Sequence, residues 1–270
     1  MIALTIAGSD SGGGAGIQAD LKTFQELGVF GTTAITALTD QNTLGVYDIY
    51  EVPPHFVQQQ IQTILDDFSV KAIKTGMLFS AEIIEAVAEV LKQQNIPLIV
   101  DPVMIAKGGA SLLQEPATKA MIEKLFPYTT ICTPNIPEAE VLTGIRIKDV
   151  EDIEKAAQCM LQMGIECVVI KGGHLEEIQA IDRVYTREQS FELVTERVKT
   201  KDTHGTGCTF SAALTANIAK GLMLKDAIIE AKKFIHLAIS TPLYIGNGHG
   251  PTNHFAYKRN LGVCEVKMNE

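Results

Sequence analysis

The chain has 270 residues, of which 46% are hydrophobic and 20% charged, and its formal net charge is −9 at pH 7. This length permits one α/β domain or two small ones, with a core that needs neither disulfides nor a structural metal, and the composition excludes a disordered chain. The acidic balance disfavours nucleic acid and anionic membranes as partners, and no apolar run approaches the roughly 20 residues needed to span a bilayer.

In chain order, short apolar runs typical of buried strands alternate with stretches of helical periodicity. The expected elements are strand Met1–Ala7, helix Gly16–Leu27, strand Gly31–Leu38, helix Phe56–Phe68, strand Ala72–Thr75, helix Ala81–Leu91, strand Pro97–Val100, strand Thr129–Thr133, helix Ile153–Met163 and strand Cys167–Lys171. This alternation predicts a mainly parallel sheet with helices on both faces.

The pattern changes in the last third of the chain. The runs Ile181–Tyr185 and Phe191–Val198 alternate with polar residues, which predicts an antiparallel hairpin or sheet edge. Two predicted helices follow, at Thr209–Ala219 and Leu224–Leu237. Because no linker, repeat or low-complexity segment divides the chain, we expect a single domain over residues 1–258 and a C-terminal tail over residues 259–270.

The cysteines indicate the compartment. There are five, and none belongs to a CxxC motif. An odd count without metal-ligand spacing argues against a disulfide framework and a zinc site, and the first residues lack the pattern of a signal peptide. We therefore expect a cytoplasmic protein.

Glycines crowd the first predicted strand-to-helix loop, Gly8–Gly16, where they let the backbone approach a ligand and expose its N–H groups. Residues 14–19 also match the dinucleotide fingerprint GxGxxA, and Asp40 lies near the distance expected of a ribose-binding carboxylate. The first glycine of the match stands several residues beyond the strand, however, so the spacing is wrong. A flexible turn explains this loop equally well.

The segment Thr203–Ala213 places Gly205 and Gly207 directly before a clear helix. Successive N–H groups at a helix N-terminus form an anion hole, and the helix dipole adds favourable potential. Cys208 falls in the first turn, where the dipole should lower the pKa of its thiol, and a thiolate could take a proton from a hydroxyl as that hydroxyl attacks phosphorus. The alternative is that Cys208 is a small buried hydrophobic residue.

Three further strand ends carry polar side chains. Asp101 follows one strand, Asn135 and Glu138 follow the next, and Lys171 ends another. Because ligands of open α/β sheets bind beyond the carboxyl ends of the strands, these groups could hold Mg²⁺, directly or through water, and neutralise phosphate. Taken singly, they are also explained as a helix cap, a first-turn dipole partner and a lysine beside a turn.

Together these loops resemble one family, the hydroxymethylpyrimidine and phosphomethylpyrimidine kinases among the ribokinase-like vitamin kinases. The resemblance extends from about Ile2 to about Tyr257. No P-loop motif and no GxSxG elbow offers a competing assignment. The motifs that carry the resemblance are Gly8-Ser9-Asp10, Gly13–Asp20, Lys74–Met77, Asp101–Met104, Thr133–Glu138, Lys171–His174 and His204–Cys208.

The resemblance implies a ribokinase-like three-layer α/β/α sandwich with a central, mainly parallel sheet, assembled as a homodimer. It implies a kinase that uses ATP and Mg²⁺. The implied substrate is 4-amino-5-hydroxymethyl-2-methylpyrimidine, which the family phosphorylates first on its hydroxyl and then on the resulting monophosphate, in thiamine biosynthesis.

The resemblance also assigns residues to roles. The catalytic group would be Gly205, Gly207 and Cys208, with Cys208 standing where sugar kinases of the superfamily carry an aspartate base. The pyrimidine pocket would be lined by Gly8, Ala15, Asp20, Gln41, Met77 and Val103. We expect the ATP site to comprise Asp101, Asn135, Glu138, Lys171 and Thr206, with Asp101 and Glu138 also serving Mg²⁺.

Gln41 has independent chemical support. A 4-aminopyrimidine offers an amine donor beside a ring-nitrogen acceptor, and a carboxamide offers the complementary pair, which is how glutamine reads adenine. The alternative is that Gln41 caps the turn after the strand.

Two departures from the family bear on the substrate. Ser11-Gly12 replaces the Pro-Ser of many members, which removes no donor N–H. Ala106 stands where related bacterial pyridoxal kinases carry a second cysteine, and that group also tends to lack a glutamine at the position of Gln41. The chain therefore favours the pyrimidine. The loop Ala106–Leu113 is expected to be a lid that excludes water.

The sequence is compatible with three alternative functions. The first is a pyridoxal or pyridoxine kinase of vitamin B6 salvage, because both substrates are flat, methylated nitrogen heterocycles with a hydroxymethyl group. The second is an NAD(P)-binding oxidoreductase built on the first glycine loop. The third is a noncatalytic nucleotide-binding protein, against which the gathering of polar side chains at successive strand ends argues.

Overall fold

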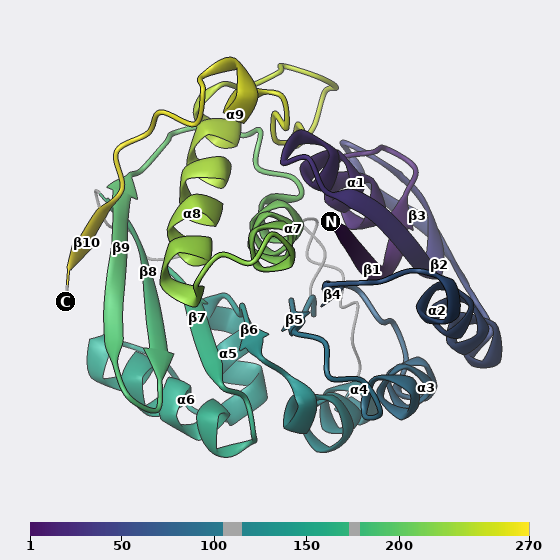
Figure 1. Cartoon of the computed structure of the whole chain (residues 1–270). Helices are drawn as coiled ribbons and strands as arrows, with labels where there is room; N and C mark the ends of the chain where they lie inside the picture. The colour runs from purple at the N-terminus through teal and green to yellow at the C-terminus, as the bar shows by residue number, and fades with distance from the viewer. Residues whose placement is uncertain (105–114, 173–178, 270) are drawn as a thin grey trace.

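Strands and helices alternate along the chain as the apolar pattern predicts, and the strands form one sheet (Figure 1). The structure is a computed structural model that describes residues 1–104, 115–172 and 179–269. The strands are β1 (Ile2–Asp10), β2 (Phe30–Asn42), β3 (Gly45–Glu51), β4 (Ala72–Thr75), β5 (Leu98–Val100), β6 (Ile131–Cys132), β7 (Cys167–Lys171), β8 (Gln179–Thr186), β9 (Ser190–Glu196) and β10 (Lys267–Asn269). The α-helices are α1 (Gly16–Glu26), α2 (Pro54–Asp67), α3 (Ala81–Leu91), α4 (Glu115–Ala120), α5 (Ile136–Thr143), α6 (Val150–Gln162), α7 (Thr206–Ala219), α8 (Leu224–Ser240) and α9 (Ala256–Arg259).

The sheet has the strand order β10-β9-β8-β7-β6-β5-β4-β1-β2-β3. Strands β2, β1, β4, β5, β6 and β7 run parallel, so their carboxyl ends meet at one edge. β3 pairs antiparallel with β2 at one side, and β8, β9 and β10 continue antiparallel at the other. The predicted mainly parallel sheet and the predicted β8–β9 hairpin are both confirmed.

Helices cover both faces of the sheet, with α1, α7 and α8 on one side and α2 to α6 on the other (Figure 1). The short strand β5 shows why both faces are apolar: Leu98 and Val100 belong to one hydrophobic cluster and Ile99 belongs to the other. Successive strand residues point to opposite faces, so a continuous apolar run buries both of them. The three-layer α/β/α architecture is therefore confirmed.

Helix α7 is the central helix of its layer. It packs against α1 and α8, and most of its residues are buried, including Phe210, Leu214 and Asn217. A helix buried on nearly all sides holds its N-terminus in one place, because neighbours on several sides oppose its movement. The residues of its first turn are therefore held in fixed positions.

Local capping explains where helices begin. Asp149 accepts a hydrogen bond from the Asp152 N–H at 3.0 Å, so α6 starts at Val150. The apolar stripe alone predicts a start at Ile153, because the acidic first turn has no apolar residue facing the core. A side-chain oxygen at the N-cap stabilises a helix start by about 1 kcal/mol.

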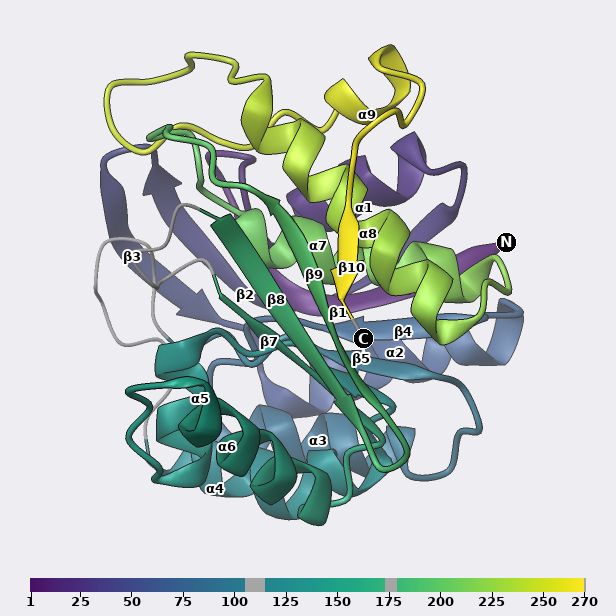
Figure 2. The ribbon, with the colours of Figure 1, turned by 90° about the vertical axis from the view of Figure 1, so that its left-hand side faces the viewer.

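Two elements lie outside the predicted set at the edges of the sheet. Strand β3 has largely exposed or half-exposed residues, so it lacks the apolar run that signals a buried strand. The C-terminal strand β10 pairs with β9 although all three of its residues are exposed, and Figure 2 shows it lying along β9. Within the described ranges, no helix is long and apolar enough to cross a membrane. The predicted lid Ala106–Leu113 and the motif residues Gly173 and His174 lie outside the described residues.

Candidate active site

A buried ion pair lies where the parallel strands end. Asp101 directly follows β5 and Lys171 ends β7, and Lys171 Nζ is 3.0 Å from Asp101 Oδ1. The Asp101 side chain is 2% exposed, whereas that of Lys171 is 16% exposed, so the ammonium group still reaches the surface of the site. Burial lowers the pKa of Lys171, but the neighbouring carboxylates of Asp101 and Glu138 outweigh this and raise it. Lys171 therefore carries a fixed positive charge.

The remaining contacts of Asp101 connect the strand ends to helix α7. Ser211 Oγ lies 3.3 Å from Asp101 Oδ2, and Thr133 Oγ1 lies 3.4 Å from Oδ1. A Cβ atom on Gly207 would lie 3.3 Å from both Asp101 Oδ2 and Lys171 Nζ. Gly207 therefore lets the first turn of α7 approach the ion pair without a side chain between them.

Asn135 and Glu138 form a reciprocal cap at the start of α5. The Glu138 N–H donates to Asn135 Oδ1 at 2.9 Å, and the Asn135 N–H donates to Glu138 Oε2 at 2.8 Å. The cap is tied to the ion pair, since the Lys171 N–H donates to the Pro134 carbonyl at 2.8 Å. Burial, with a further contribution from Asp101, raises the pKa of Glu138 to about 7 against the opposing charge of Lys171. Glu138 thus sits beside the site as a carboxyl that titrates near neutral pH.

The anion hole was predicted at the first turn of α7. The N-cap residue Gly205 has φ +78°, and a Cβ there would collide with the Gly14 carbonyl oxygen at 1.8 Å, so only glycine fits. Thr206 is held by its hydroxyl, which donates to the Thr203 carbonyl at 2.6 Å. In the described parts of the chain, the N–H groups of Gly207 and Cys208 have no acceptor. Two free amides at the positive end of a helix dipole can receive a phosphoryl oxygen.

The prediction that the helix dipole lowers the pKa of the Cys208 thiol is wrong for the ligand-free protein. Burial raises its pKa to about 12, and the charges of Asp20 and Asp101 add to this effect. Lys74 and the Gly16 N–H act in the opposite direction, and they stabilise the thiolate less than burial disfavours it. A helix dipole lowers a thiol pKa only where the sulfur keeps enough solvation for its charged form.

A second ion pair is fully buried and interacts electrostatically with Cys208. Lys74 Nζ is 3.0 Å from Asp20 Oδ2, both side chains are 0% exposed, and Thr5 Oγ1 donates to the same carboxylate oxygen at 2.6 Å. Burial lowers the pKa of Lys74, but the charges of Asp20, Cys208 and Asp101 raise it to a greater extent. Asp20, predicted to line the pyrimidine pocket, is thus fully buried and paired with Lys74 in this structure.

The first glycine loop folds around a carboxylate of its own chain. Asp10 accepts hydrogen bonds from the N–H groups of Gly12, Gly14 and Ala15 at 2.8, 3.0 and 2.8 Å. The expectation that this loop exposes its N–H groups to a ligand is wrong, because Asp10 already occupies them. Asp40, which the dinucleotide fingerprint would make the ribose-binding residue, lies in β2, opposite Asp48 of β3 in the antiparallel register. This loop is therefore a poor dinucleotide site.

The other residues predicted for the pyrimidine pocket gather at the same end of the sheet. A Cβ on Gly8 would lie 2.4 Å from Met77 Cε, so these two residues are in contact. Ala15 lies beside Gly205, and Val103 follows Asp101, to whose carbonyl its N–H donates at 2.9 Å. Gln41, in the extended end of β2, lies 3.3 Å (Nε2 to Nε2) from His204.

Sequence reasoning missed three residues of this region: Lys74, Ser211 and His204. Lys74 and His204 occur within family-like motifs, but no local pattern indicates that one pairs with Asp20 and the other with Asp10. His204 Nε2 lies 2.8 Å from Asp10 Oδ2 across 194 positions of sequence. Such long-range pairs follow from the fold.

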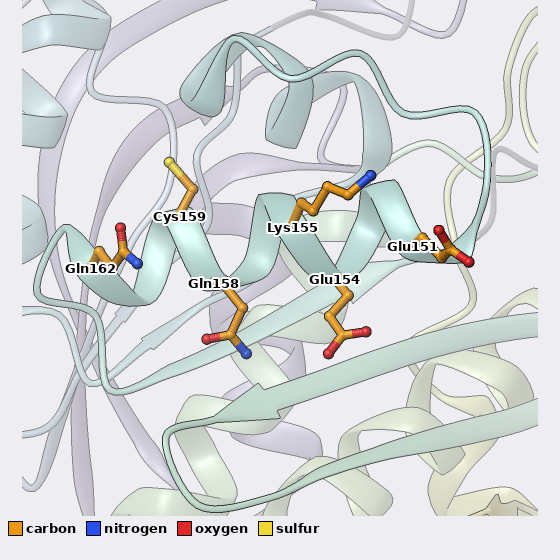
Figure 3. Close-up of a pocket in the computed structure, with 6 residues that line it drawn as sticks. All are labelled: Glu151, Glu154, Lys155, Gln158, Cys159 and Gln162. Atoms are coloured by element: carbon orange, nitrogen blue, oxygen red, sulfur yellow. The ribbon is translucent and has the colours of Figure 1, made fainter.

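A groove along the outer face of α6 is a weaker candidate (Figure 3). Its lining side chains all come from that one helix, and none belongs to a strand end. Figure 3 shows them projecting from the helix surface without converging on a common point. They are Glu151, Glu154, Lys155, Gln158, Cys159 and Gln162.

Known proteins resemble this chain along most of its length. A family model described as phosphomethylpyrimidine kinase matches residues 10–253. The hydroxymethylpyrimidine/phosphomethylpyrimidine kinase of Haemophilus influenzae is 56% identical over 95% of this chain and 97% of its own length. The thiamine biosynthesis bifunctional protein ThiED of Geobacter sulfurreducens is 48% identical over 93% of this chain and 51% of its own length.

Among solved structures, the pyridoxal kinase of Staphylococcus aureus in complex with pyridoxal superposes with a TM-score of 0.91. It shares 40% sequence identity and covers 99% of this chain and 98% of its own. The same kinase has been solved with AMP-PCP and pyridoxal together. The fold and these matches thus define a kinase of the ribokinase-like class. Within that class, the chain belongs to the phosphomethylpyrimidine kinase family.

Proposed function

We propose that this protein phosphorylates 4-amino-5-hydroxymethyl-2-methylpyrimidine with ATP, and then phosphorylates the monophosphate to the diphosphate, in thiamine biosynthesis. The observation that carries the proposal is the Asp101–Lys171 pair set against the free amides of the α7 N-terminus. A site with a fixed cation and an anion hole suits a reaction in which negative charge moves between oxygens.

In this mechanism the polyphosphate of ATP lies against Lys171, and the N–H groups of Gly207 and Cys208 receive the migrating phosphoryl group. Little covalent chemistry is needed, because phosphoryl transfer depends mainly on positioning and charge stabilisation. The Cys208 thiol first releases its proton to solvent, and the thiolate then accepts the proton of the attacking hydroxyl. As the bond from the hydroxyl oxygen to the γ-phosphorus forms, the bond from that phosphorus to the β–γ bridging oxygen breaks and ADP leaves. Lys74, the Gly16 N–H and the α7 N-terminus favour the thiolate that this step requires.

Mg²⁺ fits the site as an ion that arrives with ATP. Within the described ranges, no group of three or more histidine, cysteine, aspartate or glutamate side chains could hold a metal. Asp101 and Glu138 supply carboxylate oxygens near Lys171, and Mg²⁺ in kinases is commonly held by one or two carboxylates together with substrate phosphates and water. Bound Mg²⁺ would neutralise phosphate charge, with Asp101 and Glu138 as its protein contacts, directly or through water.

The titration of Glu138 gives a testable consequence. A carboxyl with a pKa of about 7 is mostly protonated at pH 6 and mostly ionised at pH 8, and only the ionised form attracts Mg²⁺. The apparent affinity for Mg²⁺ at saturating ATP should therefore rise about tenfold between pH 6 and pH 8. Initial rates across a Mg²⁺ titration at each pH measure this.

Glu138→Gln is the control for that prediction. The variant should show a weaker Mg²⁺ response at pH 8 and only the residual pH dependence that comes from ATP itself. A pH dependence as steep as in the unmodified protein would remove Glu138 from the metal site.

A second candidate function, pyridoxal kinase, is favoured by the fit to the Staphylococcus aureus structure. Both heterocycles are flat and carry a hydroxymethyl group, so shape alone does not separate them. Gln41 favours the aminopyrimidine, because its carboxamide matches an amine donor next to a ring-nitrogen acceptor.

The test is a competition assay with purified protein, limiting ATP, and equal concentrations of hydroxymethylpyrimidine and pyridoxal. We expect faster consumption of the pyrimidine, with product masses that correspond to one and then two added phosphates. Phosphorylation of pyridoxal alone would replace the proposal with the second candidate, and turnover of neither heterocycle would refute both.

Two further properties belong to the same proposal. We expect a homodimer in the cytoplasm. Exposed apolar side chains on the β2–β3 edge, namely Leu38, Leu44, Tyr47 and Tyr50, offer one surface for a second copy. Sedimentation velocity should give a mass near twice that of the chain, and a monomer at micromolar concentration would contradict the dimer.

A further inference from the structure

A chain of contacts links the first glycine loop to the residue that faces the heterocycle. Asp10 ends β1, and His204 precedes α7 by two positions. His204 Nε2 lies 2.8 Å from Asp10 Oδ2 and 3.3 Å from Nε2 of Gln41. Asp10 is 3% exposed, and the His204 side chain is 13% exposed.

Asp10 is held as a carboxylate. Burial raises its pKa, but the contact with His204 and the N–H groups of Ala15 and Gly12 together lower it below its ordinary value. At 2.8 Å from such a carboxylate, an imidazole nitrogen has to donate, because two lone pairs would repel each other. His204 therefore carries a proton on Nε2, in either the neutral or the cationic ring.

This proton fixes the orientation of the Gln41 carboxamide. A protonated Nε2 has no lone pair in the ring plane, so it accepts no hydrogen bond from the Gln41 amide nitrogen. The carboxamide oxygen is the atom that suits this position, because it can share the single Nε2–H with Asp10 in a three-centre hydrogen bond, at 3.3 Å from Nε2 against 2.8 Å for Asp10 Oδ2. The NH₂ group then faces Thr39 Oγ1, 3.1 Å from the other end of the amide. Thr39 can accept this bond because its own hydroxyl donates to the Ser9 carbonyl at 3.0 Å.

We propose that Asp10 and His204 are positioning residues that fix the Gln41 carboxamide in one orientation and thereby set the choice of heterocycle. The inference rests on the proposed role of Gln41 in binding the substrate. With its oxygen sharing the His204 N–H with Asp10 and one amide hydrogen bound to Thr39, Gln41 presents one remaining lone pair and one remaining N–H in a fixed order. A 4-aminopyrimidine edge matches this order, whereas pyridoxal has no amine donor to offer.

The pair also ties together the loops that form the site. Gly14 packs against the His204 ring, since a Cβ there would lie 2.5 Å from Cδ2 of that ring. The His204 N–H donates to the Gly250 carbonyl at 3.0 Å, so the histidine backbone is fixed as well. His204 therefore has little freedom to turn away from Gln41.

Two variants of His204 separate positioning from bulk packing. His204→Phe keeps a ring but removes the donor, and His204→Gln restores an N–H donor without the ring. For His204→Phe we expect the KM for hydroxymethylpyrimidine to rise about tenfold, with kcat and the KM for ATP within about twofold of the unmodified protein. The preference for the pyrimidine over pyridoxal should fall by a similar factor, and His204→Gln should recover part of it.

A double-mutant cycle with Gln41→Leu tests whether the effect passes through Gln41. If it does, His204→Phe changes the preference only when Gln41 is present. An unchanged preference in His204→Phe, or an equal loss in both backgrounds, overturns the inference. If Gln41→Leu alone leaves the pyrimidine KM unchanged, the failure lies in the proposed role of Gln41.

A readout that needs neither substrate nor a stable variant completes the test. In the unmodified protein with ¹⁵N-labelled histidine, the nitrogen that faces Asp10 should give the chemical shift of a protonated Nε2 at pH 7.5. A spectrum in which His204 Nε2 is unprotonated would overturn the inference, whatever the substrate of the enzyme.

Discussion

Replacing Cys208 by alanine should lower kcat for the first phosphorylation by about 10²- to 10⁴-fold while ATP still binds, because the variant loses the group that accepts the hydroxyl proton. The second phosphorylation should lose much less, because its acceptor is a phosphate that is already largely ionised near neutral pH. Rapid-quench assays that separate the mono- and diphosphate products measure both steps.

The pH dependence of the first step provides a second check on Cys208. The thiol pKa is raised to about 12 in the ligand-free protein, so the thiolate fraction increases with pH throughout the accessible range. The rate of the first phosphorylation should therefore rise with pH in the unmodified protein, and this rise should disappear in Cys208→Ala. Cys159→Ala, on the outer face of α6, is the matched control and should leave both rates unchanged. Equal losses in the two steps, or full activity in Cys208→Ala, would exclude the base role.

Replacing Lys74 by methionine should lower the free energy of unfolding by about 3–5 kcal/mol, because it leaves the Asp20 carboxylate buried without its counter-charge. The expected pH dependence follows from the same burial, which raises the pKa of Asp20 above its unfolded value. In the variant, the folded state keeps a proton that the unfolded chain releases, so stability should decrease as pH rises from 5 to 8. Urea denaturation at several pH values measures both effects.

The double variant Lys74→Met with Asp20→Asn is the control for the charge. It removes the unpaired carboxylate and should recover a large part of the lost stability, with a flatter pH dependence. If the single variant is as stable as the unmodified protein, or the double variant is no better than the single one, the buried pair does not have the importance assigned to it.

The sequence predicts the fold well because its strands are short, apolar on both faces and separated by helices. The runs Ala72–Thr75, Ala81–Leu91 and Cys167–Lys171 coincide with β4, α3 and β7 to the residue. Edge elements were not predictable in this way. Strand β3 and strand β10 bury little surface, so no apolar pattern distinguishes them from loops.

The residues of the site were likewise predictable only in part. Asp101 and Lys171 were predictable because each stands at a strand end, and parallel strands bring such ends together. The protonation state of Cys208 could not be predicted, since the pKa of its thiol depends on burial and on Asp20 and Lys74, which lie far away in sequence. Lys74 was the least visible of all, because a lysine inside an apolar strand carries no sign of the aspartate that neutralises it.

The hydrogen-bond partners of the first glycine loop were not predictable either. Its composition predicts exposed amides, and composition says nothing of the Asp10 carboxylate that folds back onto Gly12, Gly14 and Ala15. Glycine at these positions serves close packing of the chain on itself. Within the described residues, the amides left without an acceptor are instead those of Gly207 and Cys208, far along the chain.

The most direct test is a crystal structure of the protein with hydroxymethylpyrimidine and a nonhydrolysable ATP analogue, in which two sets of distances are measured. We expect the substrate hydroxyl to lie within hydrogen-bonding distance of Cys208 Sγ, and the terminal phosphate to contact the N–H groups of Gly207 and Cys208. A hydroxyl that faces away from the sulfur, or a terminal phosphate bound at the loop of residues 8–16, would contradict this expectation.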